Sequence, residues 1–369
     1  MYNLKIKFVS ILLSFLMTLS IAGCSGGLKS LDITVESPKE EVDIVAPEIR
    51  AYMELAKNYV EGDYSSSVKV TDNLGNMPVP VVFNWYFNDK IEFQNANIII
   101  SKNEDLSDPI KVKINKIRDV SKKQNIKVYN LETGAKYYWC IEAITGNKKA
   151  IKSDIFSFET MSGPRILNIE NVKNARDLGS WTTIDGKTIK QGVIFRTAKL
   201  NDTTADGENV LLNDLKIKTE LDLRNGANEE LYSPISDRVF YYNIAGKQNA
   251  AFWNDIFTEE KVFRIFTIPD NYPILIHCLG GADRTGALSY ALNALCGVSE
   301  TDLIMDYELI LKDIKPTAEE QRQIGEMSDR IVSYLKDKCK SDGIDAKIAV
   351  VGSVAKHTAL KGKSDIDIF

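Results

Sequence analysis

The chain contains very little histidine, since His277 and His357 are the only two among 369 residues. A metal site built mainly from imidazole ligands is therefore excluded. Cysteine is also sparse, with five residues and no C-x-x-C pair. This spacing gives neither a disulfide framework nor a zinc pattern, and we expect no bound metal and no cofactor.

The chain also lacks an excess of positive charge, because 46 Lys and Arg face 51 Asp and Glu, for a net charge of −5. General attraction to nucleic acid is not expected, so a phosphate-binding site would have to be local. The composition, 44% hydrophobic and 26% charged, is that of a globular protein with a sizeable core. The length predicts two or three domains.

No apolar run near the N-terminus is long enough to span a membrane, since the run from Phe8 to Leu19 falls short of the ~20 residues needed. Together with the cations Lys5 and Lys7, this run predicts a secretory signal over residues 1–24. The sequence IAGC ending at Cys24 resembles a bacterial lipobox. It implies cleavage before Cys24, a lipid on its sulfur and a membrane-anchored lipoprotein of the cell envelope facing away from the cytoplasm. Plain secretion is the alternative.

The next two segments predict a linker and an all-β sandwich. Residues 25–65 are polar and carry a short helical pattern from 47 to 59, so we expect a spacer with a small helix. Residues 66–162 hold short β-rich runs between polar clusters, which favours a sandwich. These runs are VPVVFNWYF, NANIIIS, QNIKVYNL, AKYYWCIEAIT and DIFSFET. The piece LETGAKYYWCIEA resembles the later strands of a fibronectin type III domain, and Cys140 within it is interpreted as a core residue.

Residues 163–310 change to an α/β pattern. IKTELDL and PILIH predict strands, and TGALSYALNALCG predicts a helix with a buried stripe at Leu288, Ala291, Leu292 and Leu295. Alternating strands and helices favour a mainly parallel sheet, in which sites form beyond the carboxyl ends of the strands.

The stretch HCLGGADRTG lies where PILIH ends and the helix begins. At such a position backbone amides and the helix dipole converge on an anion. Cys278 and Arg284 bracket a short loop that we expect to bind phosphate, and Arg284 offers a planar fork for two phosphoryl oxygens. The residues of this loop are Leu279, Gly280, Gly281, Ala282 and Asp283.

This arrangement predicts covalent phosphoryl transfer. The helix N-terminus and Arg284 favour the thiolate of Cys278, which would attack phosphorus, and water would then hydrolyse the cysteinyl-phosphate. Thr285 could donate its hydroxyl to the leaving sulfur. Amides and Arg284 neutralise the phosphoryl charge, so no metal is required. The alternative is an inert buried cysteine at a strand end.

The signature H-C-x5-R resembles the protein tyrosine phosphatase superfamily, and the loop C-x-x-G-x-D-R-T-G resembles its bacterial tyrosine phosphatase family. Three more stretches agree in order with that family, namely NARDLGSW, VIFRTAKL and LDLRNGANEE. The resemblance covers about 140 residues. It implies supporting roles for His277, Arg176, Asp177 and Arg196. Buried ion pairs of the two arginines with Asp177 or a glutamate would explain them equally well.

The substrate expected from this resemblance is a phosphorylated protein or a small phosphate ester. Family members that act on phosphoinositides tend to carry lysine where this chain has Ala282. A singly phosphorylated substrate such as phosphotyrosine is therefore favoured, with a phosphoinositide phosphatase as the alternative. Asp222, at the end of a predicted strand, is the preferred general acid, and Asp255 and Asp283 are the alternatives.

The tail, residues 311–369, resembles the start of an archaeal-type CCA-adding tRNA nucleotidyltransferase. A predicted strand leads to Gly352 and Ser353, which that family uses to hold a triphosphate, and Asp365 and Asp367 match its metal-binding pair. The segment stops short of that family's later elements, which predicts an incomplete α/β fragment from a truncation or a chimera, or a coincidental similarity. Nucleotide transfer is not expected, and no nucleic acid partner is expected.

Two other functions, each of a different class from a phosphatase, are also compatible with the sequence. The β-sandwich could be a surface-binding module for a protein or a glycan, attached to an inactive phosphatase domain that still binds phosphate through Arg284. The tail could belong to a nucleotidyltransferase. Turnover of a phosphate ester separates the first from an active enzyme, and incorporation of CTP or ATP would reveal the second.

Overall fold

The structure is a computed structural model that describes residues 30–57, 77–88, 93–114, 123–145, 150–224, 233–244 and 260–309, with residues 333, 337, 340–341, 350–351 and 367–368 beyond them. Residues 1–24 with Cys24, the candidate acid Asp255 and the tail residues Gly352, Ser353 and Asp365 lie outside this part. None of the helices within it is long and apolar enough to cross a membrane.

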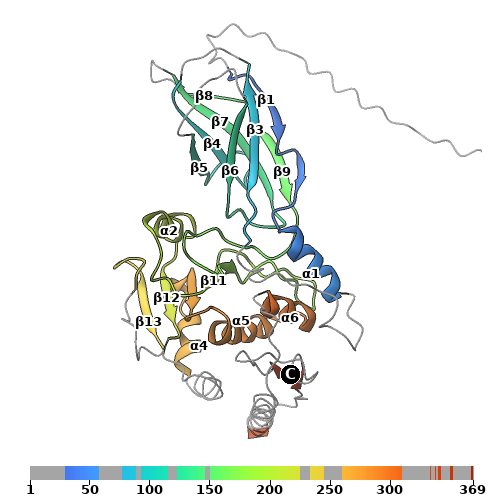
Figure 1. Cartoon of the computed structure of the whole chain (residues 1–369), viewed down its shortest axis with the longest axis vertical. Coiled ribbons are helices and arrows are strands. Elements are labelled where there is room, and N and C mark those ends of the chain that lie inside the picture. Colours follow the sequence, from blue (N-terminus) through green and yellow to red (C-terminus); the bar gives the residue numbers. More distant parts are fainter. Residues whose placement is uncertain are drawn as a thin grey trace, which may run out of the picture.

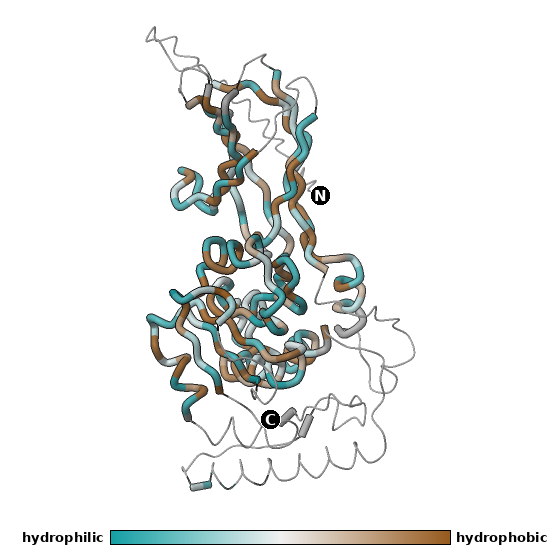
Figure 2. The backbone as a smooth tube through the Cα atoms, turned by 60° about the vertical axis from the view of Figure 1, so that its left-hand side comes forward, coloured by the Kyte–Doolittle hydropathy of each residue, from teal (hydrophilic) through white to brown (hydrophobic). Residues whose placement is uncertain are grey.

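The described chain forms two domains, a β domain (residues 30–162) above an α/β domain (residues 163–309) in Figure 1, and Figure 2 shows the same arrangement from another side. The first sheet of the β domain is antiparallel in the order β1-β3-β6, with β1 (Ile33–Ser37), β3 (Val81–Phe87) and β6 (Gln124–Val128). The second has the order β2-β9-β7-β4-β5, with β8 paired to β7. Its strands are β2 (Glu40–Val42), β4 (Phe93–Ser101), β5 (Ile110–Ile114), β7 (Lys136–Thr145), β8 (Ala150–Lys152) and β9 (Phe156–Thr160).

These two sheets enclose one hydrophobic core, because alternate residues of each strand point inward. Phe83 of β3 meets Trp139 of β7 edge to face, with ring centroids 4.9 Å apart, and meets Phe158 of β9 at 5.8 Å. All three are buried in the same cluster. Cys140 is fully buried, as expected for a core residue.

The segment predicted to be a linker is part of the β domain. We expected residues 25–65 to be a spacer, but β1 and β2 of that segment are strands of the two sheets. Helix α1 (Pro47–Lys57) is present where a short helix was expected, and it packs against the other domain. Short strands with mixed burial, such as β2, carry too little alternation to be recognised from sequence.

The α/β domain is built on a five-stranded sheet in the order β10-β11-β14-β12-β13. Four strands are parallel and β10 is antiparallel at the edge, so the expected mainly parallel sheet is present. The strands are β10 (Arg176–Asp177), β11 (Ile194–Thr197), β12 (Thr219–Asp222), β13 (Phe240–Asn243) and β14 (Ile274–His277). The central strand β14 is the predicted PILIH strand, and all four of its residues are buried.

Helices cover both faces of this sheet. Val262 of α4 and Leu288 of α5 pack with Ile274 and Ile276 on one face, while Leu211 packs with Leu275 on the other. The helical elements are α2 (Ala205–Asn209), the π-helical turn η2 (Val210–Asp214), α4 (Glu260–Phe266), the 3-10 turn η3 (Pro269–Asn271), α5 (Asp283–Leu295) and α6 (Glu300–Glu308). In the tail, β15 (Val350–Val351) pairs antiparallel with β16 (Asp367–Ile368).

The predicted stripe of α5 is only partly correct. Leu288 is fully buried, but Leu295 is 75% exposed at the end of the helix. The buried face instead runs through Ala287, Tyr290 and Asn293 as well, because α6 packs against α5 there.

The two domains are joined by buried contacts. Ile49 and Tyr52 of α1 share a hydrophobic cluster with Leu303 and Met305 of α6. The side chain of Gln191 exchanges hydrogen bonds with the backbone of Thr133, which lies in the β domain, at 3.0 and 2.8 Å. The β domain is therefore packed onto the α/β domain at more than one place.

Candidate active site

Cys278 directly follows the central strand β14 and lies at the carboxyl edge of the parallel sheet. The residues from Cys278 to Arg284, here called the Cys278 loop, turn from that strand into α5. Cys278 is 3% exposed, and α5 points its N-terminus at the loop from Asp283 onward. Sulfur, loop and helix dipole thus meet at one point, as predicted from the sequence.

The loop needs its second glycine for steric reasons. Gly281 has φ +68, and a Cβ there would lie 2.5 Å from the carbonyl oxygen of Thr197 in β11. A Cβ on Gly280 would meet nothing within 4 Å. Within the described residues, the amides of 279–282 donate to no protein acceptor, so they are available to an anion.

Arg284 and Thr285 lie on the first turn of α5. Nη1 of Arg284 donates to the carbonyl oxygen of Leu223 at 2.7 Å, which ties the guanidinium to the end of β12. Arg284 as a whole is half-buried. The hydroxyl of Thr285 is fully buried and has no hydrogen-bond partner among the described residues.

A buried polar cluster supports the loop from below. Asn174 donates to the carbonyl oxygen of Gly281 at 2.8 Å, and Nη2 of Arg196 donates to the same oxygen at 2.9 Å. Arg176 hydrogen-bonds Asn174, and both arginines are held by the carboxylate of Asp306, at 3.0 Å for Arg176 and 2.9 Å for Arg196. The residues predicted to support the site, Arg176 and Arg196, therefore act on the loop through its backbone.

Asp306 offsets part of the charge of this cluster, because its one carboxylate faces two guanidinium groups. Burial and the neighbouring Arg176 pull the pKa of Arg196 down to about 9, while Asp306 and Cys278 oppose the shift, so the guanidinium stays charged at neutral pH. Burial alone would raise the pKa of Asp306, but Arg176 and Arg196 bring it below its usual value. The expected partner of the arginines, Asp177 or a glutamate, was wrong, because Asp306 occupies that place.

Asp177 has a different partner. Its carboxylate accepts from Arg165 at 2.8 Å and from the amides of Gly179 and Gly192. Nη2 of Arg165 also donates to the carbonyl oxygen of Asn130 in the β domain, at 2.6 Å. Asp177 thus fixes the start of the α/β domain against the β domain, and does not contact the Cys278 loop.

Asp222, the preferred general acid, is placed unfavourably for that role. It is fully buried and binds Arg224 through both carboxylate oxygens, and it also accepts from Tyr241 at 2.8 Å. Burial alone would raise its pKa, but the Arg224 side chain and His277 lower it below the usual value. An ion-paired carboxylate with a lowered pKa is a poor proton donor. This corrects our choice of Asp222.

Asp283 and Asp255 are the two alternative general acids. Asp283 is exposed at the start of α5, directly before Arg284. Asp255 lies outside the described residues.

His277, the residue before the nucleophile, is fully buried, and its Nε2 lies 2.8 Å from Oε1 of Glu220 in β12. It anchors the end of β14 to its neighbouring strand.

Asp306 is the main residue that the sequence-based reasoning missed. It lies on α6 three residues after the buried Leu303, on the buried face of the helix. The sequence carried one signal of this role. Asp306 falls on the apolar face of a helix, and because buried charges are paired, it needed a cation such as the two arginines of the ordered motifs.

Comparisons with known proteins agree with this geometry. A model of the tyrosine phosphatase family matches residues 167–359. That range contains the whole Cys278 loop and its support, and it extends past residue 310 into the segment that we assigned to another family. Because the model matches more than half of the chain, the chain belongs to the tyrosine phosphatase family.

The chain is also similar to CCA-adding enzymes over a short stretch. The enzyme of Methanothermobacter thermautotrophicus is 52% identical over 64 residues, 17% of this chain and 14% of that protein. The enzyme of Thermoplasma acidophilum is 38% identical over 66 residues, 18% of this chain and 15% of that protein. This chain therefore spans about a seventh of the length of these relatives.

Among solved structures, the core catalytic domain of the PP-IP phosphatase SIW14 from S. cerevisiae, in complex with citrate, is similar at 22% identity. The match covers 44% of this chain and 93% of that one, with a TM-score of 0.28.

Proposed function

We propose that this protein hydrolyses phosphomonoesters, phosphotyrosine foremost, through a covalent intermediate on Cys278. The observation that carries the proposal is the Cys278 loop. It places a thiol at the N-terminus of α5, beside amides that have no acceptor among the described residues and beside the half-buried Arg284. Such a site neutralises a phosphoryl dianion without a metal.

The reaction proceeds in two displacements. The Cys278 thiolate attacks phosphorus, an S–P bond forms, the P–O bond of the ester breaks, and an acid protonates the leaving oxygen. Water then attacks phosphorus, the S–P bond breaks, and the thiolate and inorganic phosphate are released. The amides of the loop and Arg284 hold the equatorial oxygens in both steps. The buried hydroxyl of Thr285, which lacks a partner among the described residues, stabilises the leaving sulfur in the second.

For the acid, the geometry favours Asp283. It is exposed at the mouth of the loop, whereas Asp222 is buried and ion-paired. Asp255 is the alternative. Substrates with different leaving groups identify the acid. Loss of the acid slows the hydrolysis of esters of weakly acidic alcohols far more than that of activated aryl esters. Asp283→Asn should show that pattern, and Asp255→Asn should show it instead if Asp255 is the acid.

The substrate preference follows from position 282. Ala282 is buried within the loop and brings no second positive charge to it. A singly phosphorylated side chain is therefore favoured over a phosphoinositide, which remains the alternative substrate. Comparing kcat/KM for a phosphotyrosine peptide with that for a soluble phosphoinositide decides between them.

The intermediate can be trapped directly. Wild-type protein quenched with acid during turnover should carry a phosphoryl group on the peptide that contains Cys278, as measured by mass spectrometry. With p-nitrophenyl phosphate, whose leaving group needs little protonation, Asp283→Asn is expected to form this adduct as well, and Cys278→Ser should lack it. Phosphate on another residue, with none on Cys278, would refute the mechanism.

We also propose that the protein is exported and anchored by a lipid on Cys24, with its domains facing away from the cytoplasm. The short charged and apolar start and the IAGC sequence support this. Labelled fatty acid should be incorporated into the wild-type protein and not into Cys24→Ala.

For the β domain we propose a fibronectin type III relationship. The strands predicted from sequence and the common core of the two sheets support it. A binding module for a protein or a glycan, with the phosphatase inactive, is the competing function. Loss of all turnover in folded protein would favour it.

A nucleotidyltransferase is the second candidate for the tail, on the 52% identity to a CCA-adding enzyme over 64 residues. It predicts metal-dependent incorporation of CTP or ATP into tRNA. Absence of incorporation, beside measurable phosphatase activity, would remove it.

A further inference from the structure

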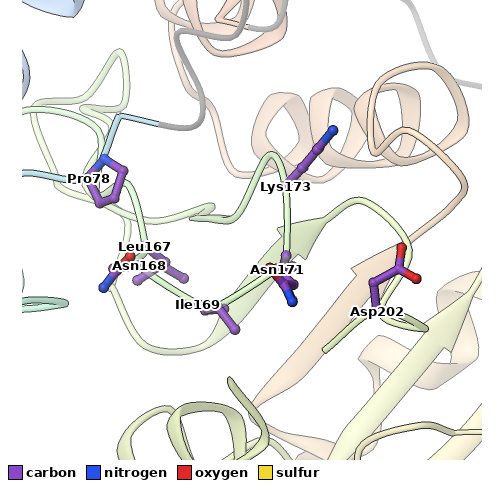
Figure 3. Close-up of a pocket in the computed structure, with 8 residues that line it drawn as sticks. Pro78, Leu167, Asn168, Ile169, Asn171, Lys173 and Asp202 are labelled. Carbon is purple, nitrogen blue, oxygen red and sulfur yellow. The ribbon is translucent and has the colours of Figure 1, made fainter. Parts of the chain in front are cut away.

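A groove of about 390 Å³ lies on the surface of the α/β domain near its border with the β domain. Its lining is mixed: Leu167, Ile169 and Val172 are buried beneath it, and its rim carries the exposed side chains of Asn168, Asn171, Lys173 and Asp202. Figure 3 shows its lining as a row, with Pro78 at one end and Asp202 at the other. The lining residues are Pro78, Leu167, Asn168, Ile169, Asn171, Val172, Lys173 and Asp202.

One end of the groove is separated from the Cys278 loop by the short segment of Ala198 and Lys199. The carbonyl oxygen of Lys173 accepts from the amide of Ala198 at 2.8 Å, and the next amide, that of Lys199, donates to Leu279 of the loop at 3.1 Å. Nζ of Lys199 in turn pairs with Asp202 at 3.1 Å. Lys173 and Asp202 therefore flank the segment that touches the residue after the nucleophile.

The other end of the groove reaches the β domain. Pro78 belongs to the segment leading into β3. The backbone of Asn168 is held by the side chain of Asn130, which accepts from its amide at 2.7 Å and donates to its carbonyl oxygen at 3.1 Å. These contacts hold the backbone of Asn168 at the rim of the groove.

We propose that this groove binds the polypeptide segment that carries the phosphorylated residue, so that the substrate is a phosphoprotein and not a free phosphate ester. The proposal rests on the phosphatase function of Cys278. A ligand that fills both the Cys278 loop and a groove leading away from it is longer than one phosphorylated side chain. The volume is within the range of roughly 300–1,000 Å³ typical of ligand sites.

The chemistry of the rim fits an extended chain. Asn168 and Asn171 offer side-chain amides that can pair with backbone N–H and C=O groups of such a chain. Lys173 adds a positive charge that favours an acidic residue next to the phosphorylated one.

Two exposed variants test the groove. Asn171 has φ +60, so Asn171→Gly removes the side chain without backbone strain. Lys173→Glu reverses the rim charge. The matched control is Lys218→Glu, also exposed but at the amino end of β12, on the opposite edge of the sheet. Each protein is assayed with a phosphotyrosine peptide flanked by glutamates, one flanked by lysines, and p-nitrophenyl phosphate.

The measured quantity is the ratio of kcat/KM for a peptide to kcat/KM for p-nitrophenyl phosphate. Asn171→Gly should lower this ratio about fivefold for both peptides, as expected for one lost hydrogen bond. Lys173→Glu should lower the ratio of acidic to basic peptide about fivefold, and Lys218→Glu should change neither ratio. If wild type hydrolyses all three substrates and the groove variants keep its ratios, the groove proposal is overturned and the phosphatase stands. If folded wild type hydrolyses none, both are overturned.

Discussion

The carboxylate of Asp306 lies 2.9 Å from Nη1 of Arg196, and both side chains are buried. Arg196 in turn donates to the carbonyl oxygen of Gly281 in the Cys278 loop. Asp306 lies on α6, and α6 packs against α1, the helix that precedes β3 in the chain. The position of the Cys278 loop therefore depends on α1. The packing of α1 on α6 therefore links the β domain to the support of the Cys278 loop through Asp306.

Replacing Asp306 by asparagine should destabilise the protein strongly. Two buried guanidinium groups would lose their counter-charge, which costs about 3–5 kcal/mol in comparable buried pairs. Urea unfolding measures the loss. The control Asp237→Asn removes an exposed carboxylate and should change the free energy of unfolding by less than about 0.5 kcal/mol. Equal effects of the two variants would contradict the role of Asp306.

The two glycines of the Cys278 loop should differ in their tolerance of alanine. Gly281→Ala places a Cβ against Thr197 at a positive φ, so the loop must shift and kcat/KM should fall at least about a hundredfold. Gly280→Ala meets no atom within 4 Å and should keep more activity. The initial rate with an aryl phosphate compares them, and the reverse order of activity would be inconsistent with this loop geometry.

The contribution of Asp222 to stability should depend on pH. Its pKa in the folded protein is below the ordinary value of about 3.9. The stability that it provides is thus complete above about pH 4 and is lost as the pH falls through the lower, folded-state value. The difference in free energy of unfolding between wild type and Asp222→Asn should shrink between pH 5 and pH 3, at values chosen around that ordinary pKa. A difference that is constant over this range would rule out the ion-paired state of Asp222.

Helix α1 should be required for the stability of both domains. Ile49 is fully buried against α6, so Ile49→Ala should cost about 2–5 kcal/mol. Thermal unfolding should show tryptophan fluorescence and phosphatase activity lost together at a lower temperature. The control Ile184→Ala affects a side chain that is 83% exposed and should leave the transition in place. Separate transitions for fluorescence and activity would show that the domains are not coupled.

Much of the site could be predicted because its parts are adjacent in sequence. Strand, cysteine, glycines, arginine and helix follow one another from Ile274 onward, and each has a local signature. The strands of the β domain with strong alternation, such as β3, were predicted for the same reason.

The remainder depends on contacts between distant residues. The Arg176–Asp306 pair joins residues 130 positions apart, and no local pattern specifies which carboxylate reaches which arginine. The same holds for Asp222, whose strand-end position fitted a general acid until Arg224 and Tyr241 were seen to enclose it. The burial of α1 against α6 likewise could not be predicted, because α1 lies in a segment of mainly polar residues.

The most direct test is the rate of p-nitrophenyl phosphate hydrolysis at mildly acidic pH in excess chelator, for the wild-type chain and for Cys278→Ser. The account predicts turnover that persists in chelator and disappears with the sulfur, while Cys278→Ser still binds inorganic phosphate. Turnover retained by Cys278→Ser, or no turnover by folded wild type, would contradict it.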